Sequence, residues 1–309
     1  MLGCRRILSF SFYSHEPHAL CCACGCERRN AISLAVFMAI VAAGSIGAGL
    51  LGSLTGLGGG IIVIPLLTLA LGVDIRYAIG ASLVSVIATS SGAAAAYVRE
   101  GFVNIRIGMF LEVATVSGAL LGAFAAAYIP ASAIAVVFGL VLLYSAYVGI
   151  RGYGADNPVV APDNLATRLR MNGAYPSAGG VRLYNVRSVV PGMGLMAFAG
   201  ILSGLLGIGS GALKVIAMDR IMKIPFKVST TTSNFMIGVT AAAGAGVYLN
   251  RGYVDPVVDL PVMLGVLAGS LVGSRILTKA RTGALRVIFA IVIALVGMEM
   301  MYKGLSGRF

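Results

Sequence analysis

Long apolar segments separated by short polar ones make up the chain after residue 30. This pattern predicts helices at about 77–98, 106–128, 132–150, 188–206, 228–249, 256–276 and 284–303, after a first apolar segment over residues 31–52. Two other apolar segments, Ile61–Gly72 and Ala212–Met222, are short, and the first has only 12 residues. Twelve residues of helix span about 18 Å, against roughly 30 Å for the hydrocarbon core of a bilayer. We therefore expect two half-helices.

Glycines break the chain just before each half-helix. Gly58, Gly59 and Gly60 precede the first, and Gly209, Ser210 and Gly211 precede the second. Glycine lowers helix propensity and permits unusual backbone angles. Both flanks are apolar, so we expect these breaks at membrane depth, where irregular backbone is tolerated only inside protein or beside a cavity. The two breaks are the first candidate sites.

An internal repeat relates the two breaks. A shift of 151 residues, without a gap, superimposes one series of residues on another: Gly49, Leu51, Leu54, Gly56, Gly58 and Gly60 on Gly200, Leu202, Leu205, Gly207, Gly209 and Gly211. The same shift pairs Ser82 with Ser233, Thr89 with Thr240, and Gly118 and Gly122 with Gly269 and Gly273. A series at one offset indicates duplication of a transporter-like unit. The paired glycines, four residues apart, are expected to let helices pack closely.

The predicted fold is an all-α polytopic membrane protein with two inverted five-segment repeats, each containing a Gly-broken short helix. An odd number of segments per repeat makes the second repeat insert upside down. The expected organisation is a leader over residues 1–30, repeat 1 over 31–150, a linker over 151–187, repeat 2 over 188–303 and a tail over 304–309. The linker is rich in Gly, Pro, Asn and Arg and shows no apolar period, so it is predicted to be a loop.

Composition agrees with a membrane protein and argues against a soluble one. Hydrophobic residues make up 58% of the chain and charged residues 11%, and the mean hydropathy is +0.94. The formal net charge is +12. Charges are costly at the bilayer centre, so we assign this excess to loops and to attraction of an anionic substrate rather than to nucleic acid. The membrane part has no His, Cys or acid cluster, so an enzyme is not expected, and neither is a cofactor.

The leader differs from the rest of the chain. It contains all five Cys and both His, with the spacing His15-x-x-His18-x-x-Cys21-Cys22-x-Cys24-x-Cys26. Such a run can bind a soft metal. The simpler interpretation, a disordered leader or a gene start placed too far upstream, is preferred.

Basic residues predict the orientation in the cell (inner) membrane. The side of the membrane that carries the linker has fourteen Lys and Arg residues, and the other side has eight. Cytoplasmic loops carry the excess of positive charge. The linker is therefore predicted to be cytoplasmic and both termini outside, although Arg28 and Arg29 beside the first helix argue the opposite way.

Lys214 is the most distinctive site candidate. Helix N-termini attract anions, and two inverted repeats would bring two half-helix N-termini to one midplane site. Lys214 comes three residues after Gly211, where the positive helix end repels a cation and a bound anion would relieve that repulsion. The alternative is that Lys214 extends its amine to the membrane interface.

Hydroxyl and amide side chains supply further candidates. Ser82, Ser85 and Thr89 share one helix face, and Ser233 and Thr240 repeat the two ends of it. These hydroxyls are expected either to donate to an anion or to bond backbone and neighbouring helices. The run Thr230–Asn234 is expected either to line the site, with Asn234 as an amide donor, or to cap a helix.

Three charged residues complete the candidates. Arg76 and Lys227 correspond under the shift and lie on opposite sides of the membrane, so they either form the two mouths of an anion path or are simply solvated. Glu112 lies inside a predicted helix, and its counterpart is Met263. An intramembrane carboxylate either couples transport to protons or pairs with a nearby Arg in a static network.

These features resemble the sulfite exporter TauE/SafE family over roughly residues 31–303. The resemblance rests on the two Gly-rich breaks, on Ala81-Ser82 and Thr232-Ser233 near helix starts, and on the loops Gly101-Phe-Val103 and Gly252-Tyr-Val254. The break Gly56-Leu-Gly-Gly-Gly60-Ile-Ile-Val-Ile-Pro65 is its most specific part. The second break departs from the pattern at Ser210 and lacks the proline. The family implies export of sulfite, sulfonates and related small oxyanions.

The expected function is therefore export of small anions such as sulfite or organosulfonates by a multi-pass membrane protein. Its partners would be a small anionic substrate and the lipid bilayer. Two alternatives stay open: a channel-like anion pore, and a membrane assembly protein that transports nothing.

Overall fold

The computed structural model describes residues 36–50, 59–99, 103–151, 163–177, 180–277 and 282–307. The chain divides into two units, Met1–Phe37 and Met38–Phe309, and the arrangement below concerns the second. The leader, Gly58 and the Pro-containing stretch of the linker lie outside the described residues.

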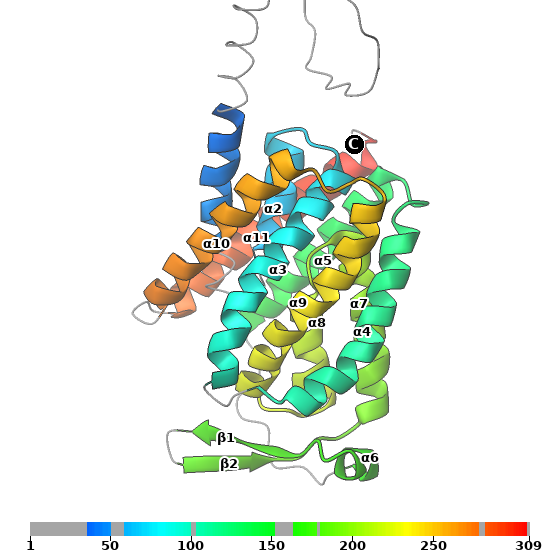
Figure 1. The fold of residues 1–309 in the computed structure, drawn as a ribbon, viewed down its shortest axis with the longest axis vertical. Helices are drawn as coiled ribbons and strands as arrows, with labels where there is room; N and C mark the ends of the chain where they lie inside the picture. The colour runs from blue at the N-terminus through cyan, green and yellow to red at the C-terminus, as the bar shows by residue number, and fades with distance from the viewer. Residues whose placement is uncertain are drawn as a thin grey trace, which may run out of the picture. The chain divides into compact units, whose positions relative to one another are not determined.

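Long helices dominate the described chain, as predicted (Figure 1). The apolar helix Val36–Leu50 comes first. It is followed by α3 (Ile75–Arg99), α4 (Ile105–Ala125), α5 (Ala131–Arg151), α7 (Val189–Leu206), α9 (Phe226–Asn250), α10 (Pro256–Leu277) and α11 (Thr282–Leu305). All of them lie close to the ranges predicted from hydropathy.

The helices have the apolar surface of a membrane protein. Among the described residues, three helices are long and apolar enough to cross a bilayer: Ile105–Ala125, Ala131–Val148 and Val189–Leu206. Large apolar side chains are exposed along them, including Val113, Leu121 and Phe198. In water such residues would be a liability, whereas lipid accommodates them. The all-α membrane class is therefore confirmed.

Both half-helices are present. Helix α2 (Gly60–Pro65) continues into the π-helical turn η1 (Leu66–Ala70), and α8 (Gly211–Ile216) continues into η2 (Ala217–Ile221). These elements begin and end at positions that differ by 151 residues. π-Helical turns are rare and occur often at functional sites. Pro65 precedes the first one, but the second has no proline, so proline is not their common cause.

Contacts between helices repeat at the same offset. A Cβ on Gly118 would overlap the Ala197 carbonyl oxygen of α7, and one on Gly269 would overlap the Ile46 carbonyl oxygen of the first helix. Likewise, a Cβ on Gly200 would overlap the Thr115 carbonyl and one on Gly49 the Val266 carbonyl. Each pair of contacts differs by 151 residues with the partners exchanged. The predicted close packing at Gly118 and Gly269 is thus confirmed.

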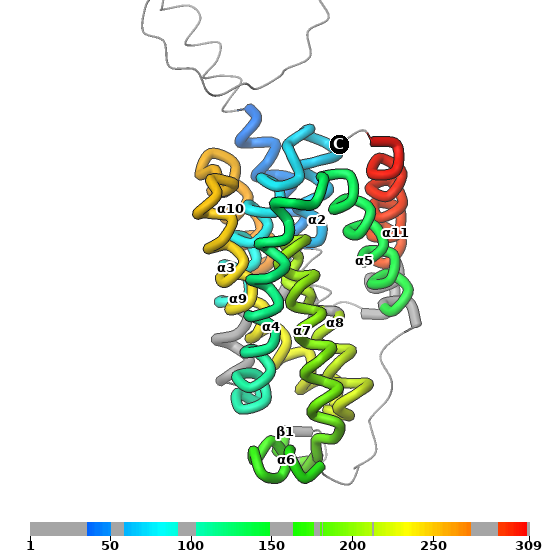
Figure 2. The backbone as a smooth tube through the Cα atoms, turned by 90° about the vertical axis from the view of Figure 1, so that its right-hand side faces the viewer, coloured from blue at the N-terminus to red at the C-terminus, as the bar shows by residue number. Residues whose placement is uncertain are grey.

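The central pair of helices, α3 and α9, is antiparallel. Tyr77 near the start of α3 packs edge to face on Tyr253 just beyond α9, with ring centroids 5.6 Å apart. Farther along, the Ser90 hydroxyl lies directly against Gly238 of α9. Figure 2 shows α4 beside α7 and α5 beside α11, two pairs that are also in contact.

The linker is not entirely a loop, so that prediction was wrong for its described part. Residues 163–187 contain α6 (Asn164–Arg168) and an antiparallel hairpin of β1 (Gly173–Ser177) and β2 (Gly180–Tyr184). Buried residues of this segment join the core of the bundle: Ala166, Met171, Tyr175, Tyr184 and Val186 pack with Met196, Met218, Met222 and Met236. These apolar residues stand singly between polar ones and form no periodic pattern, so the sequence did not predict their packing.

Asn104 ties the linker to the bundle. Its side chain caps α4 by accepting from the Ile107 amide and donates to the Met171 carbonyl and the Tyr184 hydroxyl. Burial raises the pKa of the Tyr184 phenol, and the hydrogen bond from Asn104 only partly opposes this. Tyr184 therefore stays a neutral hydroxyl, and the hairpin is held against the ends of α4 and α9.

Candidate functional site

The two glycine breaks meet inside the bundle. Gly60 is buried at the start of α2, and a Cβ there would collide with the Ser82 hydroxyl and lie 2.8 Å from Val86 Cγ2, both on α3. The same Cβ would lie 3.5 Å from the carbonyl oxygen of Gly207 in the second break. Gly59 is also buried. The sequence hypothesis required the breaks to be neighbours, and the described glycines are.

The second break is a tight left-handed turn. Gly207, Gly209 and Ser210 have φ of +68°, +70° and +45°. A non-glycine residue in this region costs roughly 1–2 kcal/mol, so Ser210 carries strain, whereas its counterpart Gly59 has a right-handed φ of −65°. A Cβ on Gly209 would lie 2.7 Å from Ile237 of α9, which explains why only glycine fits there.

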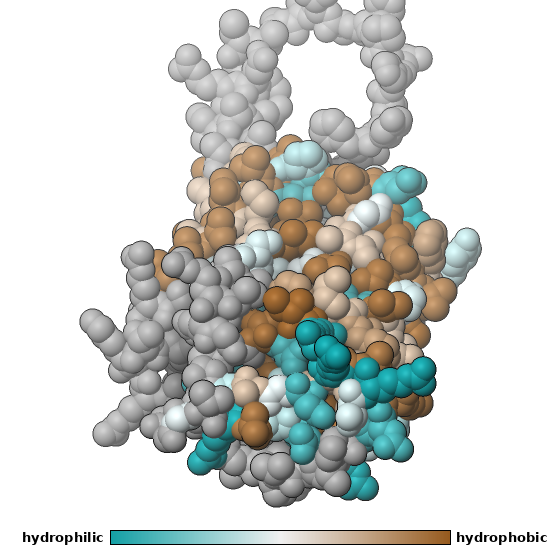
Figure 3. All heavy atoms as spheres, turned by 60° about the horizontal axis from the view of Figure 1, so that its bottom comes forward, coloured by the Kyte–Doolittle hydropathy of each residue, from teal (hydrophilic) through white to brown (hydrophobic). Residues whose placement is uncertain are grey.

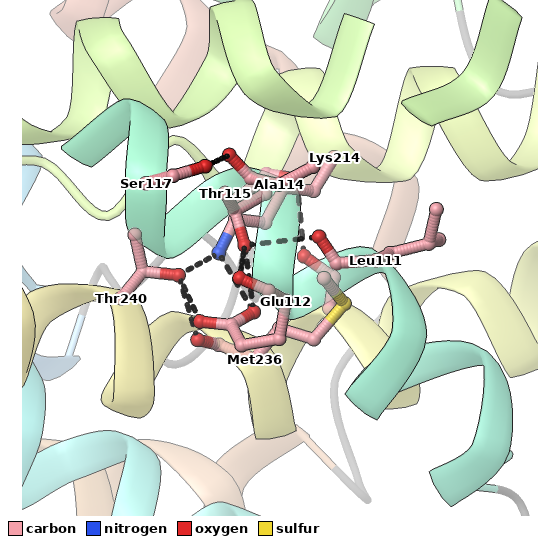
Figure 4. Close-up of polar contacts among 10 residues, drawn as sticks. Leu111, Glu112, Ala114, Thr115, Ser117, Lys214, Met236 and Thr240 are labelled. Carbon is pink, nitrogen blue, oxygen red and sulfur yellow. Dashed lines mark hydrogen bonds and ion pairs between the residues drawn. The ribbon is translucent and has the colours of Figure 1, made fainter. Parts of the chain in front are cut away.

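Lys214 lies in the interior, not at the interface. Its relative exposure is 0%, so the prediction that it extends to the membrane surface is wrong. The amine donates to the Thr240 hydroxyl of α9 at 2.5 Å, and it lies 3.8 Å from Glu112 Oε2 of α4. Three separate elements, α8, α9 and α4, therefore meet at one buried cation (Figure 4).

Glu112 is the counter-ion of this cation. Its Oε1 accepts from the Thr240 hydroxyl at 2.5 Å, and its Oε2 accepts from the Thr115 hydroxyl at 2.9 Å. Thr240 thus bridges the amine and the carboxylate. Burying a charge is costly unless it is paired and hydrogen-bonded. Glu112 does pair statically with a cation, as one sequence hypothesis held, but the partner is Lys214 rather than an Arg.

The amine keeps spare donor capacity. A lysine ammonium has three N–H donors. Thr240 takes one of them, and at 3.8 Å the nearest carboxylate oxygen of Glu112 is beyond hydrogen-bond distance. Among the described residues Thr240 is the one hydrogen-bond acceptor of this fully buried amine, which can therefore donate to an additional anionic oxygen.

Apart from Thr240, the predicted hydroxyls bond to backbone in this structure. Ser82 donates to the Gly207 carbonyl and Ser233 to the Gly211 carbonyl, so each ties one of the central helices to the second break. Ser85 and Thr89 bond carbonyls of their own helix. These bonds match the packing alternative, and they leave the anion-donor role a prediction.

The run Thr230–Asn234 does not cap a helix. Helix α9 begins at Phe226, so the run lies inside it. Thr230 and Thr231 bond carbonyls one turn earlier, and Thr232 accepts from the Asn104 amide. Asn234 is half-buried. The capping alternative is therefore wrong, and a role of Asn234 as a donor stays a prediction.

Arg76 and Lys227 lie at opposite ends of the bundle, because they begin the antiparallel helices α3 and α9. Arg76 is half-buried. It donates to the Ile129 carbonyl at 3.3 Å and lies over the Tyr253 ring at 5.9 Å. Lys227 is exposed at the end that carries the linker hairpin. Neither is brought to the Lys214 amine.

The polar centre combines Glu112 and Thr115 of the first repeat with Lys214 and Thr240 of the second, and the repeat offset does not reproduce it. The offset pairs Lys214, Glu112 and Thr115 with the apolar residues Val63, Met263 and Val266. Thr89, the counterpart of Thr240, bonds only its own helix. The two repeats therefore share the framework, but the charged pair occurs at only one of the two places that the offset makes equivalent.

A cavity of about 230 Å³ lies away from Lys214, Glu112 and Thr240. It is lined by Ile61, Ile62, Pro65, Leu66, Leu69, Leu142, Val292, Ile293 and Val296, from α2, η1, α5 and α11. This lining is wholly apolar and includes no residue of the Lys214 centre. It has no group that could bind an anion.

Thr115 and Asp259 are two of the buried polar residues that sequence reasoning missed. Thr115 follows Glu112 by three residues on the same helix face, and this spacing was a usable signal. Asp259 of α10 is also buried. It was missed because an acidic residue in the first turn of a helix has an ordinary explanation in the helix dipole.

Comparison with known proteins agrees with this architecture. The chain is 30% identical over 277 residues to the probable membrane transporter protein YunE of Bacillus subtilis, covering 87% of this chain and 98% of that protein. It is 29% identical over 209 residues to the probable membrane transporter protein YdhB of the same organism, covering 67% and 77%. No solved structure matches the chain. The sequence profile described as "Sulfite exporter TauE/SafE" matches residues 40–300, and the chain therefore belongs to this family of membrane transporters.

Proposed function

We propose that this membrane transporter exports small oxyanions such as sulfite or organosulfonates, with Lys214 as the charge that binds them. The observation that carries the proposal is the fully buried Lys214 amine, in the first turn of a half-helix, whose one hydrogen-bond acceptor among the described residues is Thr240. In the resting state Glu112 neutralises the amine. An anionic substrate would take the place that this carboxylate now fills.

The proposed framework is a pair of inverted repeats. A two-fold relation with its axis in the membrane plane makes equivalent helices antiparallel and exchanges the partners of equivalent contacts. The antiparallel α3 and α9 and the matched contacts of Gly118 and Gly269 support it. The meeting of Gly60 with the second break supports a common midplane site.

The basic end of the bundle is proposed to face the cytoplasm. Eight described basic residues are exposed at the end with the linker: Arg106, Arg168, Arg170, Arg182, Arg187, Arg220, Lys223 and Lys227. Figure 3 brings this end forward and shows hydrophilic side chains gathered there. At the opposite end Asp74, Asp255 and Glu299 balance Arg76, Arg251 and Lys303. The excess favours a cytoplasmic linker in the inner membrane, and it would concentrate anions at the entrance.

Export agrees with the direction of the membrane potential. An inside-negative potential favours outward movement of an anion by about 2.3 kcal/mol per charge per 100 mV. The membrane potential by itself would drive export of an anion without a coupling ion.

The test measures efflux of radiolabelled sulfite and of an organosulfonate from loaded proteoliposomes. The double variant Lys214→Met with Glu112→Gln removes the cation without leaving a bare buried carboxylate. We expect efflux to fall to the level of loaded liposomes that contain no protein. The matched control, Lys303→Met with Glu299→Gln, removes an exposed ion pair of 3.6 Å and should export normally.

Three outcomes would contradict the proposal. Efflux at the wild-type rate from the folded buried-pair variant would exclude Lys214 from the site. A voltage-driven, non-saturating current would indicate the channel-like pore, and no flux across a panel of anions would favour the assembly protein.

A further inference from the structure

Asp259 is a buried carboxylate that the proposed transport path does not use. It lies in the first turn of α10 with a relative exposure of 5%, and neither oxygen accepts a hydrogen bond from any described residue. The contrast with Glu112 is plain, since that carboxylate has two hydroxyl donors and a cation. A buried polar group without a partner is rare in native proteins and calls for an explanation.

The environment of Asp259 contains no described counter-ion. Just before its own helix lies Asp255, four residues earlier, whose backbone carbonyl accepts from the Asp259 amide at 2.8 Å. The first helix, Val36–Leu50, has no titratable residue. The other helix packed against α10 is α3, where Arg76 and Tyr77 are the titratable residues nearest this end. The Arg76 guanidinium bonds the Ile129 carbonyl and lies over Tyr253.

The repeat offset indicates where the side chain points. Gly108 is the counterpart of Asp259 on α4, and a Cβ there would meet Thr232, Phe235 and Met236 of α9. Under the repeat offset α10 corresponds to α4, and α3 takes the place of α9. Asp259 of α10 is therefore expected to face α3, as Gly108 of α4 faces α9. Burial of the carboxyl agrees with this direction.

The helix dipole does not compensate an ionised Asp259. A negative charge near a helix N-terminus gains typically 0.3–1 kcal/mol. An unpaired polar group in an apolar setting costs roughly 1–3 kcal/mol when neutral, and an ionised one costs far more. Asp255 adds like-charge repulsion and already caps the helix by accepting from the Val257 amide at 2.9 Å. The neutral acid is therefore the favoured form in this structure.

We infer that Asp259 is a proton-binding site of the transporter, occupied by a proton in the state described here. It lies at the end opposite the linker hairpin, proposed to face outward, whereas Glu112 lies beside Lys214. Proton coupling was one of the two sequence hypotheses for Glu112, and a static ion pair was the other. Its pairing with Lys214 accounts for that carboxylate as a counter-ion and leaves Asp259 as the exchangeable acid.

Thermal unfolding of the purified full-length protein tests the inference and needs no substrate. Melting temperatures of the wild type and Asp259→Asn are compared from acidic to mildly alkaline buffers without sodium. If folding keeps Asp259 protonated where the unfolded chain ionises it, the wild type loses stability as the pH rises through that range. Asn mimics the neutral acid, so the variant should melt with the wild type in acid and at least about 2–4 °C above it in alkali.

Two further variants keep the result interpretable. Asp255→Asn retains a capping side chain and should still lose stability as the pH rises, because Asp259 remains in place. Asp259→Leu replaces the carboxyl by apolar atoms and should lose the pH dependence in the same way as Asp259→Asn, which covers the case in which the Asn variant does not fold.

Parallel profiles for the wild type and both Asp259 variants would overturn the inference. It would also fail if Asp255→Asn flattened the profile, or if sodium chloride stabilised the wild type beyond choline chloride and this difference vanished in Asp259→Asn. The last result would indicate a sodium site. None of these outcomes bears on sulfite efflux, so the inference can fail while the proposed function stands.

Discussion

At the scale of residues, the centre of the molecule depends on mutual neutralisation of two buried charges. Lys214 and Glu112 come from different repeats and share the bridging hydroxyl of Thr240. Removal of one member of a buried pair exposes the other to an apolar setting, whereas removal of both costs much less. The stability contributions of the two residues are therefore coupled.

This coupling predicts a non-additive mutant cycle. Lys214→Met and Glu112→Gln should each lower the free energy of unfolding by about 3–5 kcal/mol, because each leaves one buried polar or charged group without its partner. The double variant should lose far less than the sum of the two. Denaturant or thermal unfolding of the four proteins measures the interaction energy. Additive losses would mean that the two groups do not interact in the folded protein.

At the scale of elements, helix pairs approach through glycines that repeat at one offset. Gly200 packs on the Thr115 carbonyl and Gly49 on the Val266 carbonyl. Both contacts are to backbone, which cannot yield as a flexible side chain does. Close approach of helices through small residues is the usual device where lipid removes the hydrophobic driving force.

Alanine substitutions test this symmetry of contacts. Gly200→Ala and Gly49→Ala should each destabilise the protein by about 1–3 kcal/mol through overpacking. The controls are Gly194→Ala and Gly47→Ala on the same two helices, where a Cβ would have no heavy atom within 4 Å. The controls should melt as the wild type does. A loss confined to one of the two tested glycines would argue against equivalent interfaces.

At the scale of the whole molecule, charge is distributed unevenly between the two ends of the second unit. The exposed basic residues gather at the end with the linker hairpin (Figure 3). Helix α11 ends at Leu305, and Gly304 lies against Ser132 at the start of α5, the end opposite the hairpin. A cytoplasmic linker therefore predicts an external C-terminus.

Reporter fusions measure this orientation. Alkaline phosphatase fused to the C-terminus should be active, since it folds only outside the cytoplasm, and green fluorescent protein at the same place should be dark. The opposite pair of signals would place the linker end outside and reverse the proposed direction of the path.

The sequence by itself determined the membrane class, the long helices, the two half-helices and the 151-residue offset. These follow from hydropathy and from glycine, whose effects act over a few neighbouring residues. It also singled out Lys214 and Glu112 separately, because a charge in an apolar segment is visible without a structure.

Only the tertiary structure decided how those residues meet. Packing of α4, α8 and α9 made Glu112 the partner of Lys214, and burial of scattered apolar residues made a predicted loop into a helix and a hairpin. The same packing left Asp259 without a partner. Such outcomes depend on which helix faces come together. Contacts between residues that are distant in the chain leave no periodic pattern in the local sequence, so the sequence alone does not predict them.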